Sequence, residues 1–290
     1  MRRAALGLAA AALAACVGTG IAACAILAPQ TLSWSEIASR PLPPAPARTA
    51  YGSDPLQFGE LRLPPGRGPF PVAMLIHGGC WLAQFDYRYM THLADALTRM
   101  GVATWTIEYR RVGNPGGGWP GTFDDAASAT AQLALLAKAQ PLDLTRLVAV
   151  GHSAGGHLAL WLASRHEPPE FSGVIGLAPI TDLARYSQQQ DCGEAVVPLM
   201  GGAPAQQAAR YARASPIERL PLRVRQRLVA AEQDRIVPLA QVQDYAAAAR
   251  AAGDDVSLSV VAGAGHFDLL TEDGAGWPAI RAAVVELLKP

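Results

Sequence analysis

The stretch LVAVGHSAGG, residues 147–156, decides the fold of this 290-residue chain. Its four apolar residues predict a buried strand, and the apolar spacing from His157 to Arg165 predicts a helix directly after the turn. A serine in the motif G-x-S-x-G between a strand and a helix sits in a sharp turn that exposes its hydroxyl. Glycines two residues before and after it leave room for the strand and the helix to approach. Ser153 is therefore the candidate nucleophile.

Short apolar strands and helical repeats alternate through the rest of the body, which predicts an α/β fold with a mostly parallel sheet and helices on both faces. The predicted strands are 57–63 (an early edge strand), 71–76, 102–107, 147–150, 173–177, 227–231 and 256–261, and the predicted helices are 89–100, 123–139, 157–165, 239–252 and 277–288. Residues 180–220 break this alternation and are interpreted as a small cap inserted over the carboxyl edge of the sheet, where ligands bind in such folds.

The N-terminus has a different character. Two arginines precede an uncharged, small-residue stretch, which predicts an export signal or membrane anchor over residues 1–28. Leu13–Cys16 resembles the lipobox of bacterial lipoproteins, with a second match ending at Cys24, so Cys16 and Cys24 are candidate lipidation sites. An uncleaved membrane helix stays an alternative, although Ala and Gly insert weakly, and so does a misassigned start with the enzyme beginning near Ser33.

These features predict an exported protein, periplasmic or attached to a membrane through its N-terminus. Residues 29–49 are Pro-rich and are interpreted as a tether, and residues 50–290 as one α/β domain. The formal net charge is zero and half of the residues are apolar, which supports a large core and excludes a nucleic-acid partner.

Two cysteines lie in the body, too few for a disulfide framework. Cys80 and Cys192 either form a single bridge in an oxidising compartment or stay unpaired as small apolar residues. Because no Cys/His cluster has zinc spacing, we expect neither a metal nor a cofactor.

The base and the acid of a serine nucleophile are expected downstream, in the order Ser, Asp, His. Asp234 follows the strand that ends at Ala231, and His266 lies in a Gly-rich loop after the strand that ends at Val261. Both follow the carboxyl end of a strand, as Ser153 does, so the three side chains are predicted to meet at one edge of the sheet.

The other candidates for these two roles are weaker. Asp182, which follows strand 173–177, is the rival acid. His152 and His157 are expected to point elsewhere because they lie on the nucleophile's own turn and helix. His92 and His166 occupy helix positions and are interpreted as surface or packing residues.

A Gly-rich stretch, HGGCW at residues 77–81, directly follows the strand 71–76. Glycines let backbone N–H groups approach the carbonyl oxygen on which acyl transfer builds negative charge. The predicted oxyanion-hole donors are Gly79, Cys80 and Ala154, and His77 is interpreted as a brace for the loop. Nearby aromatic side chains either line an apolar substrate pocket or pack under the cap: Trp81, Phe85, Tyr87 and Trp119.

With these residues in place, the chain resembles the α/β-hydrolase superfamily over about residues 50–288. Within it, the chain is similar to bacterial esterases and lipases of the hormone-sensitive lipase group. HGGCW also resembles the HGGxW motif of kynurenine formamidases, and departs from the HGGG of the esterases at Cys80.

The pattern and the resemblance together predict a serine hydrolase that cleaves a small carboxylic ester through a Ser-His-Asp triad and an acyl-enzyme. An arylformamidase or other amidase with the same triad is the first alternative, and a non-catalytic binding protein on a hydrolase fold is the second. The expected partner is a small-molecule ester or amide.

Overall fold

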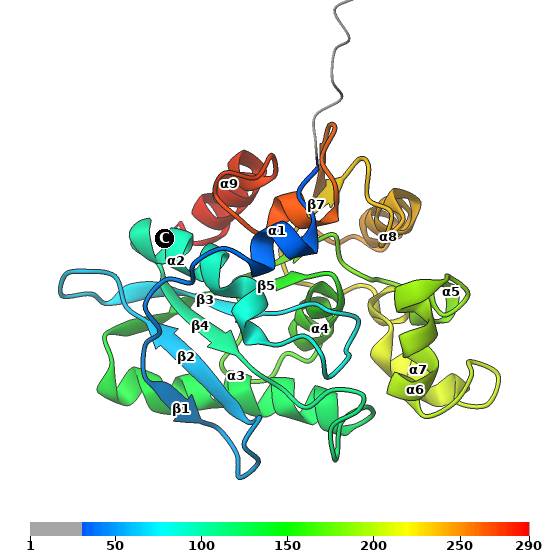
Figure 1. The fold of residues 1–290 in the computed structure, drawn as a ribbon, viewed down its shortest axis with the longest axis horizontal. Coiled ribbons are helices and arrows are strands. Elements are labelled where there is room, and N and C mark those ends of the chain that lie inside the picture. Colours follow the sequence, from blue (N-terminus) through cyan, green and yellow to red (C-terminus); the bar gives the residue numbers. More distant parts are fainter. Residues whose placement is uncertain (1–30, 290) are drawn as a thin grey trace, which may run out of the picture. The chain divides into compact units, whose positions relative to one another are not determined.

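One sheet with strand order β1-β2-β4-β3-β5-β6-β7-β8 organises the computed structural model, which describes residues 31–289 (Figure 1). β1 pairs with β2, and β2 with β4, in antiparallel fashion, whereas the remaining neighbours are parallel. The strands are β1 (Arg48–Ala50), β2 (Phe58–Arg62), β3 (Phe70–Ile76), β4 (Ala103–Ile107), β5 (Leu142–His152), β6 (Gly173–Leu177), β7 (Gln226–Ala231) and β8 (Val256–Val261).

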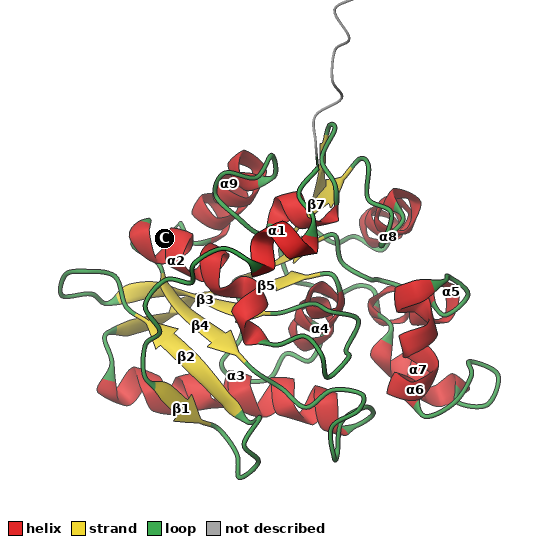
Figure 2. Ribbon diagram, in the orientation of Figure 1, coloured by secondary structure: helices red, strands yellow, loops and turns green. Residues whose placement is uncertain are grey.

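Helices lie on both sides of this sheet (Figure 2). The α-helices are α1 (Trp34–Ala38), α2 (Thr91–Arg99), α3 (Gly121–Ala139), α4 (Ala154–Ala163), α5 (Leu183–Tyr186), α6 (Val196–Met200), α7 (Ala208–Ala214), α8 (Leu239–Ala251) and α9 (Trp277–Leu287). The 3₁₀ segments are η1 (Tyr87–Met90), η2 (Asp191–Ala195), η3 (Pro216–Arg219) and η4 (His266–Leu269).

Strand β3 shows how the period of two builds both layers of the core. Val72, Met74 and Ile76 belong to an apolar cluster with residues of α3, α4 and α8. Ala73 and Leu75 belong to a second cluster with residues of α2 and α9. All five are fully buried, so the strand reads as a continuous apolar run because both of its faces are covered. The predicted α/β fold is confirmed.

Two predictions about the N-terminal part of the body were wrong. β2 is not an edge strand, because β1 pairs along its outer side. The segment expected to be a tether holds α1 and β1 and belongs to the same compact unit as the sheet. Ser33 and Glu36 form a reciprocal capping box that starts α1. The interpretation from proline content did not predict this helix.

The predicted cap corresponds to residues 180–220. They carry the short elements α5, η2, α6, α7 and η3, and in Figure 1 the three helices α5, α6 and α7 gather beside the sheet. Their apolar side chains, among them Val196, Leu199 and Tyr211, join the cluster on the α3 side of the sheet. Packing therefore fixes the insertion to the main domain.

The predicted export signal and both candidate lipidation sites, Cys16 and Cys24, lie outside the described residues. Among the helices that the structure describes, none combines the length and the apolar character needed to cross a membrane.

Candidate active site

Ser153 occupies the turn between β5 and α4 with φ 56° and ψ −120°. A non-glycine residue at such an angle costs roughly 1–3 kcal/mol and persists only where its surroundings enforce it. The enforcement is visible here: a side chain at Gly151 would collide with the Gly155 carbonyl, and one at Gly155 with the Ile76 carbonyl. The Ser153 N–H also donates to the Leu177 carbonyl at 2.8 Å. The motif forms the strained turn that the sequence predicts.

His266 and Asp234 meet although they come from different loops. The His266 Nδ1 and the Asp234 Oδ2 lie 2.6 Å apart, and both side chains are buried. The other carboxylate oxygen, Oδ1, accepts the N–H groups of Ile236 and Val237, each at 2.8 Å. These bonds fix the carboxylate, which in turn directs the Nε2 edge of the imidazole away from Asp234.

The His266 loop is also held against the nucleophile's turn. His152, the residue immediately before Ser153, has its ring centroid 4.4 Å from that of His266. Its Nε2 lies 2.9 Å from the His266 carbonyl oxygen. Ser153 and His266 therefore come from segments that are in direct contact.

The rival acid has a different role. Asp182 accepts the Arg185 N–H at 3.0 Å and so caps the N-terminus of α5. Asp268, two residues after His266, accepts the N–H groups of Gly265 and Leu32. Of these three carboxylates, Asp234 is the one bonded to the imidazole.

The loop HGGCW lies against the same turn. A Cβ built at Gly78 would stand 2.8 Å from the His152 carbonyl oxygen and 3.1 Å from the Ser153 Cβ, so any other residue would push the loop away from this turn. Gly79, Cys80 and Trp81 all have positive φ. Within residues 31–289 the N–H groups of Gly79 and Cys80 donate no hydrogen bond, and Ala154 is the first residue of α4, whose N–H lacks an intrahelical acceptor.

A buried polar cluster packs against the HGGCW loop and holds it in place. The His77 ring bonds to the Gly78 carbonyl at 2.8 Å and to the Glu108 carboxylate at 3.1 Å, and it stacks on Tyr109. Arg111 pairs with the same carboxylate at 2.6 Å. Burial raises the pKa of Glu108, but the His77 ring and the Arg111 guanidinium outweigh it and bring that pKa below its ordinary value.

His77 is thus a brace, as expected, whereas the roles of Glu108 and Arg111 were missed. The available signal was a run of polar residues, Glu108–Arg111, placed directly after a buried strand.

Cys80 and Cys192 are joined by a disulfide, which resolves the alternatives that the sequence left open. Their Cα atoms lie 5.2 Å apart, within the range usual for such bridges. Cys80 belongs to the loop beside Ser153, and Cys192 to η2 in the cap. The bridge therefore connects the predicted oxyanion loop covalently to the cap.

The four aromatic residues considered for a substrate pocket lie in different environments. Trp81 is fully buried, edge-on to the His157 ring, and Tyr87 packs on Phe58 while its hydroxyl accepts from Arg48. Both are packing residues. Trp119 is half-buried against Phe123 and lies under the Arg213 guanidinium of α7.

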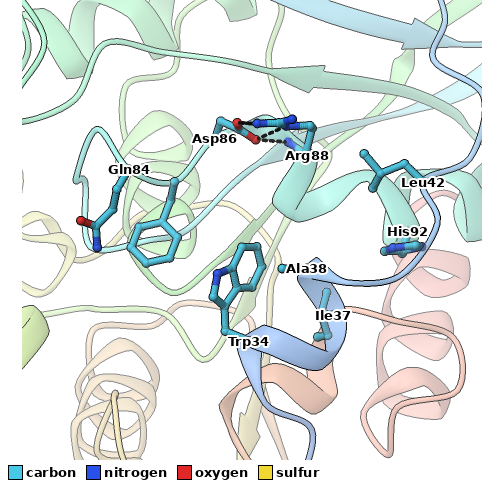
Figure 3. A pocket seen from close by; sticks show the side chains of 9 residues that line it. Trp34, Ile37, Ala38, Leu42, Gln84, Asp86, Arg88 and His92 are labelled. Atoms are coloured by element: carbon cyan, nitrogen blue, oxygen red, sulfur yellow. Dashed lines mark hydrogen bonds and ion pairs between the residues drawn. The ribbon is translucent and has the colours of Figure 1, made fainter.

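Phe85 lines a cavity of about 240 Å³ beside the site (Figure 3). In the close view, Trp34 and Ala38 of α1 face the ion-paired Asp86 and Arg88 across the cavity. Its lining residues are Trp34, Ile37, Ala38, Leu42, Gln84, Phe85, Asp86, Arg88 and His92. Because residues 29–49 were interpreted as a tether, the contribution of α1 to this cavity was not predicted.

No cluster of three or more His, Cys, Asp or Glu side chains with the arrangement of a metal site occurs in the part of the chain from Thr31 to Lys289.

Comparison with known proteins identifies relatives of this chain. The chain is 25% identical over 180 residues to the versiconal hemiacetal acetate esterase of Dothistroma septosporum. That alignment covers 56% of this chain and 53% of the relative, so the chain spans about half the length of the curated relative it matches.

Two solved structures show the same fold. A bifunctional GH43-CE of Bacteroides eggerthii matches with a TM-score of 0.72 and 20% identity, covering 83% of this chain and 38% of that one. Esterase B of Lactobacillus rhamnosis matches with a TM-score of 0.71 and 17% identity, covering 83% of each chain.

The BD-FAE family model matches residues 60–248, which carry the HGGCW loop, the Ser153 turn and Asp234. The resemblance to the α/β-hydrolase superfamily is thereby confirmed. Since the match covers roughly two thirds of the chain, this α/β-hydrolase belongs to the BD-FAE family.

Proposed function

We propose that this chain is a serine hydrolase that cleaves a small carboxylic ester through an acyl-enzyme. The observation that carries the proposal is the 2.6 Å contact between His266 Nδ1 and Asp234 Oδ2, held against the strained turn that presents Ser153. A serine hydroxyl is a weak nucleophile until an oriented base removes its proton, and these residues provide a base together with the group that orients it.

In the proposed reaction, the Ser153 hydroxyl attacks the ester carbonyl while His266 Nε2 takes its proton. Asp234 keeps the proton of the neutral imidazole on Nδ1 and stabilises the imidazolium. The alcohol leaves with the proton that His266 returns to it. Water then attacks the acyl-enzyme with His266 again as the base, which releases the acid and restores Ser153.

Negative charge on the carbonyl oxygen would be stabilised by the N–H groups of Gly79, Cys80 and Ala154. Each such donor is worth about 3–4 kcal/mol of activation free energy when it is aimed at the oxyanion. Two features support this role: the first two donors are unengaged within residues 31–289, and Ala154 begins α4, where the helix dipole favours negative charge.

The relatives favour a short acyl ester as the first substrate class to examine. One curated relative is named an acetate esterase, and a structure of esterase B from Lactobacillus rhamnosis is described as inhibited by a tributyrin phosphonate. For this chain we propose short-chain esters, and we regard formamides, suggested by the HGGxW resemblance, as the competing substrate class.

The test compares wild type, Ser153→Ala and Ser172→Ala on a panel of short p-nitrophenyl esters and on N-formylkynurenine. Ser172 is the matched control, because it precedes β6 at the opposite end of the strands and its hydroxyl bonds to the Leu147 carbonyl. We expect ester turnover and fluorophosphonate labelling in wild type and in Ser172→Ala. Turnover in Ser153→Ala should fall by at least about a thousandfold.

Each other result has a defined meaning. Wild-type turnover in Ser153→Ala would remove the nucleophile. Preferential cleavage of the formamide would make the protein an arylformamidase. Ligand binding without labelling or turnover would indicate a non-catalytic member of the fold.

We further propose that the protein is exported and is periplasmic or attached to a membrane through its N-terminus. The charge pattern of residues 1–28 supports this, and so does the Cys80–Cys192 bridge, because disulfides persist in oxidising compartments. Intact mass of the protein from the membrane fraction tests the lipid anchor, with Cys16→Ser and Cys24→Ser as paired variants. A full-length, unlipidated mass in the soluble cytosolic fraction would contradict the proposal.

A further inference from the structure

His152 makes contacts that the proposed chemistry does not use. Its ring is fully buried between Tyr89 of η1 and the loop that carries His266. Nδ1 lies 2.7 Å from the Tyr89 hydroxyl, and Nε2 lies 2.9 Å from the His266 carbonyl oxygen. The second bond joins residues 114 positions apart in the chain, and one of them directly precedes the nucleophile.

The two bonds define the tautomer of the neutral ring. A carbonyl oxygen only accepts, so Nε2 carries the proton and donates it to His266. Nδ1 of the neutral ring is then an acceptor, and the Tyr89 hydroxyl donates to it. Burial lowers the pKa of His152 well below its ordinary value, and the nearby His266 lowers it further, so His152 stays neutral while His266 gains and loses its proton.

Tyr89 is itself held in place. Its ring stacks on Trp34 of α1 with centroids 4.8 Å apart and planes 24° apart. Trp34 also contacts Phe85, which lines the cavity, and Phe267, which directly follows His266. A continuous line of packed rings thus runs from the N-terminal helix to the His266 loop.

We propose that His152 is a positioning residue that sets the distance between nucleophile and base, with Tyr89 fixing its tautomer. This rests on the proposed function, since it concerns the catalytic efficiency of Ser153 and His266. The physical reason is that the two reacting groups come from separate segments, and their separation must hold to a fraction of an ångström. His152 shares its backbone with the Ser153 turn and binds the backbone of His266, so one side chain fixes both.

The test replaces His152 by Gln or by Asn, whose side-chain amides mimic different nitrogens of the imidazole ring. Gln places its amide nitrogen near the position of Nε2 and keeps the donor to the His266 carbonyl, whereas Asn reaches only the position of Nδ1. Tyr89→Phe removes the donor to Nδ1. Tyr245→Phe is the matched control, because its buried hydroxyl bonds to Gln226 away from the site.

Each variant is titrated with a fluorophosphonate, so that kcat on a short p-nitrophenyl ester counts only folded sites, and a thermal melt is recorded. Displacement of a reacting group by about 1 Å lowers the rate about a hundredfold. We expect His152→Asn to lose about a hundredfold in kcat and in labelling rate with KM changed less than about threefold. His152→Gln should recover most of this loss, Tyr89→Phe should lose about tenfold, and Tyr245→Phe should match wild type.

A readout that does not depend on activity is the imidazole ¹⁵N NMR spectrum of the wild type. It should show His152 protonated at Nε2 and unprotonated at Nδ1 throughout pH 5–8. A ring protonated at Nδ1 would overturn the inference.

Equal kcat per titrated site in His152→Asn and wild type would overturn it too, and so would equal losses in the Asn and Gln variants, which would indicate general packing. If instead wild type is neither labelled nor active, the proposed function fails, and the tautomer measurement still decides the position of His152.

Discussion

At Asp234, replacement of one carboxylate oxygen by an amide group should remove most of the proposed activity, because this oxygen bonds to the His266 imidazole. In Asp234→Asn, the new amide group can donate toward His266 Nδ1 and favour the tautomer with its proton on Nε2, which cannot accept from serine. We predict a fall in kcat of about 10³–10⁴-fold with little change in KM. Steady-state kinetics on a short p-nitrophenyl ester provide the measurement.

The control for this change is Asp182→Asn, which alters the rival carboxylate. Because Asp182 caps α5 and asparagine caps a helix about as well as aspartate, this variant should change stability by less than about 0.5 kcal/mol and leave kcat within about twofold of wild type. An inactive Asp182→Asn beside an active Asp234→Asn would exchange the two assignments.

His157 gives a second prediction at this scale, on stability against pH. It is fully buried with Nε2 bonded to the Ala214 carbonyl at 3.0 Å, and burial lowers its pKa to about 4. The unfolded chain, with an ordinary imidazole pKa of about 6.5, binds more protons between these two values. The free energy of unfolding contributed by His157 is therefore complete above pH 6.5 and is lost as pH falls toward 4, by up to about 3 kcal/mol.

Urea unfolding at pH 7 and at pH 4.5 tests this with wild type and His157→Gln, which does not titrate. Wild type should lose about 2–3 kcal/mol more than the variant over this interval. Identical pH dependence in the two proteins would show that folding does not lower the pKa of His157.

Among the elements, the cap and the HGGCW loop should behave as one unit because the Cys80–Cys192 bridge joins them. It closes a loop of 112 residues, for which chain entropy predicts a stabilisation of about 4–5 kcal/mol. Reduction with dithiothreitol should lower the melting temperature. It should also lower kcat, because the loop that carries the proposed donors Gly79 and Cys80 is then no longer bonded to the cap.

Cys192→Ser is the matched variant, since it removes the bridge and keeps Cys80. Its activity and melting temperature should equal those of reduced wild type and should not respond to reductant. If dithiothreitol leaves wild type unchanged while mass spectrometry shows both thiols free, the bridge has no role in holding the loop.

At the scale of the whole molecule, the residues that contact the candidate site reach back to Thr31. The Thr31 side chain lies against Gly265, the Leu32 N–H donates to Asp268, and Trp34 packs on Tyr89. We predict that a chain starting at Thr31 has a kcat/KM within about twofold of the full chain. A chain starting at Tyr51, without α1 and β1, should melt lower by on the order of 10 °C and lose activity.

Esterase assays and thermal melts of the two truncated chains provide the comparison. Equal stability of both would mean that α1 and β1 contribute nothing to the body. A loss of activity already in the chain from Thr31 would assign a catalytic contribution to residues before it.

The sequence alone determined the alternating fold and identified Ser153, Asp234 and His266 as the proposed triad, because each of these features depends on a local pattern. Strand periodicity, glycine spacing and the position of a polar residue after a buried strand are all set within a few residues of the chain. The HGGCW loop and the bracing role of His77 were accessible for the same reason.

Tertiary structure decided what depends on contacts between distant segments. It joined Cys80 to Cys192, placed Trp81 and Tyr87 in the packed interior, and turned a Pro-rich stretch into a helix against the His266 loop. It also directed His152 toward His266, although the sequence suggested that a residue on the nucleophile's own turn points elsewhere. Local pattern specifies which elements form, but which side chains meet depends on how those elements pack, and spacing along the chain does not encode that packing.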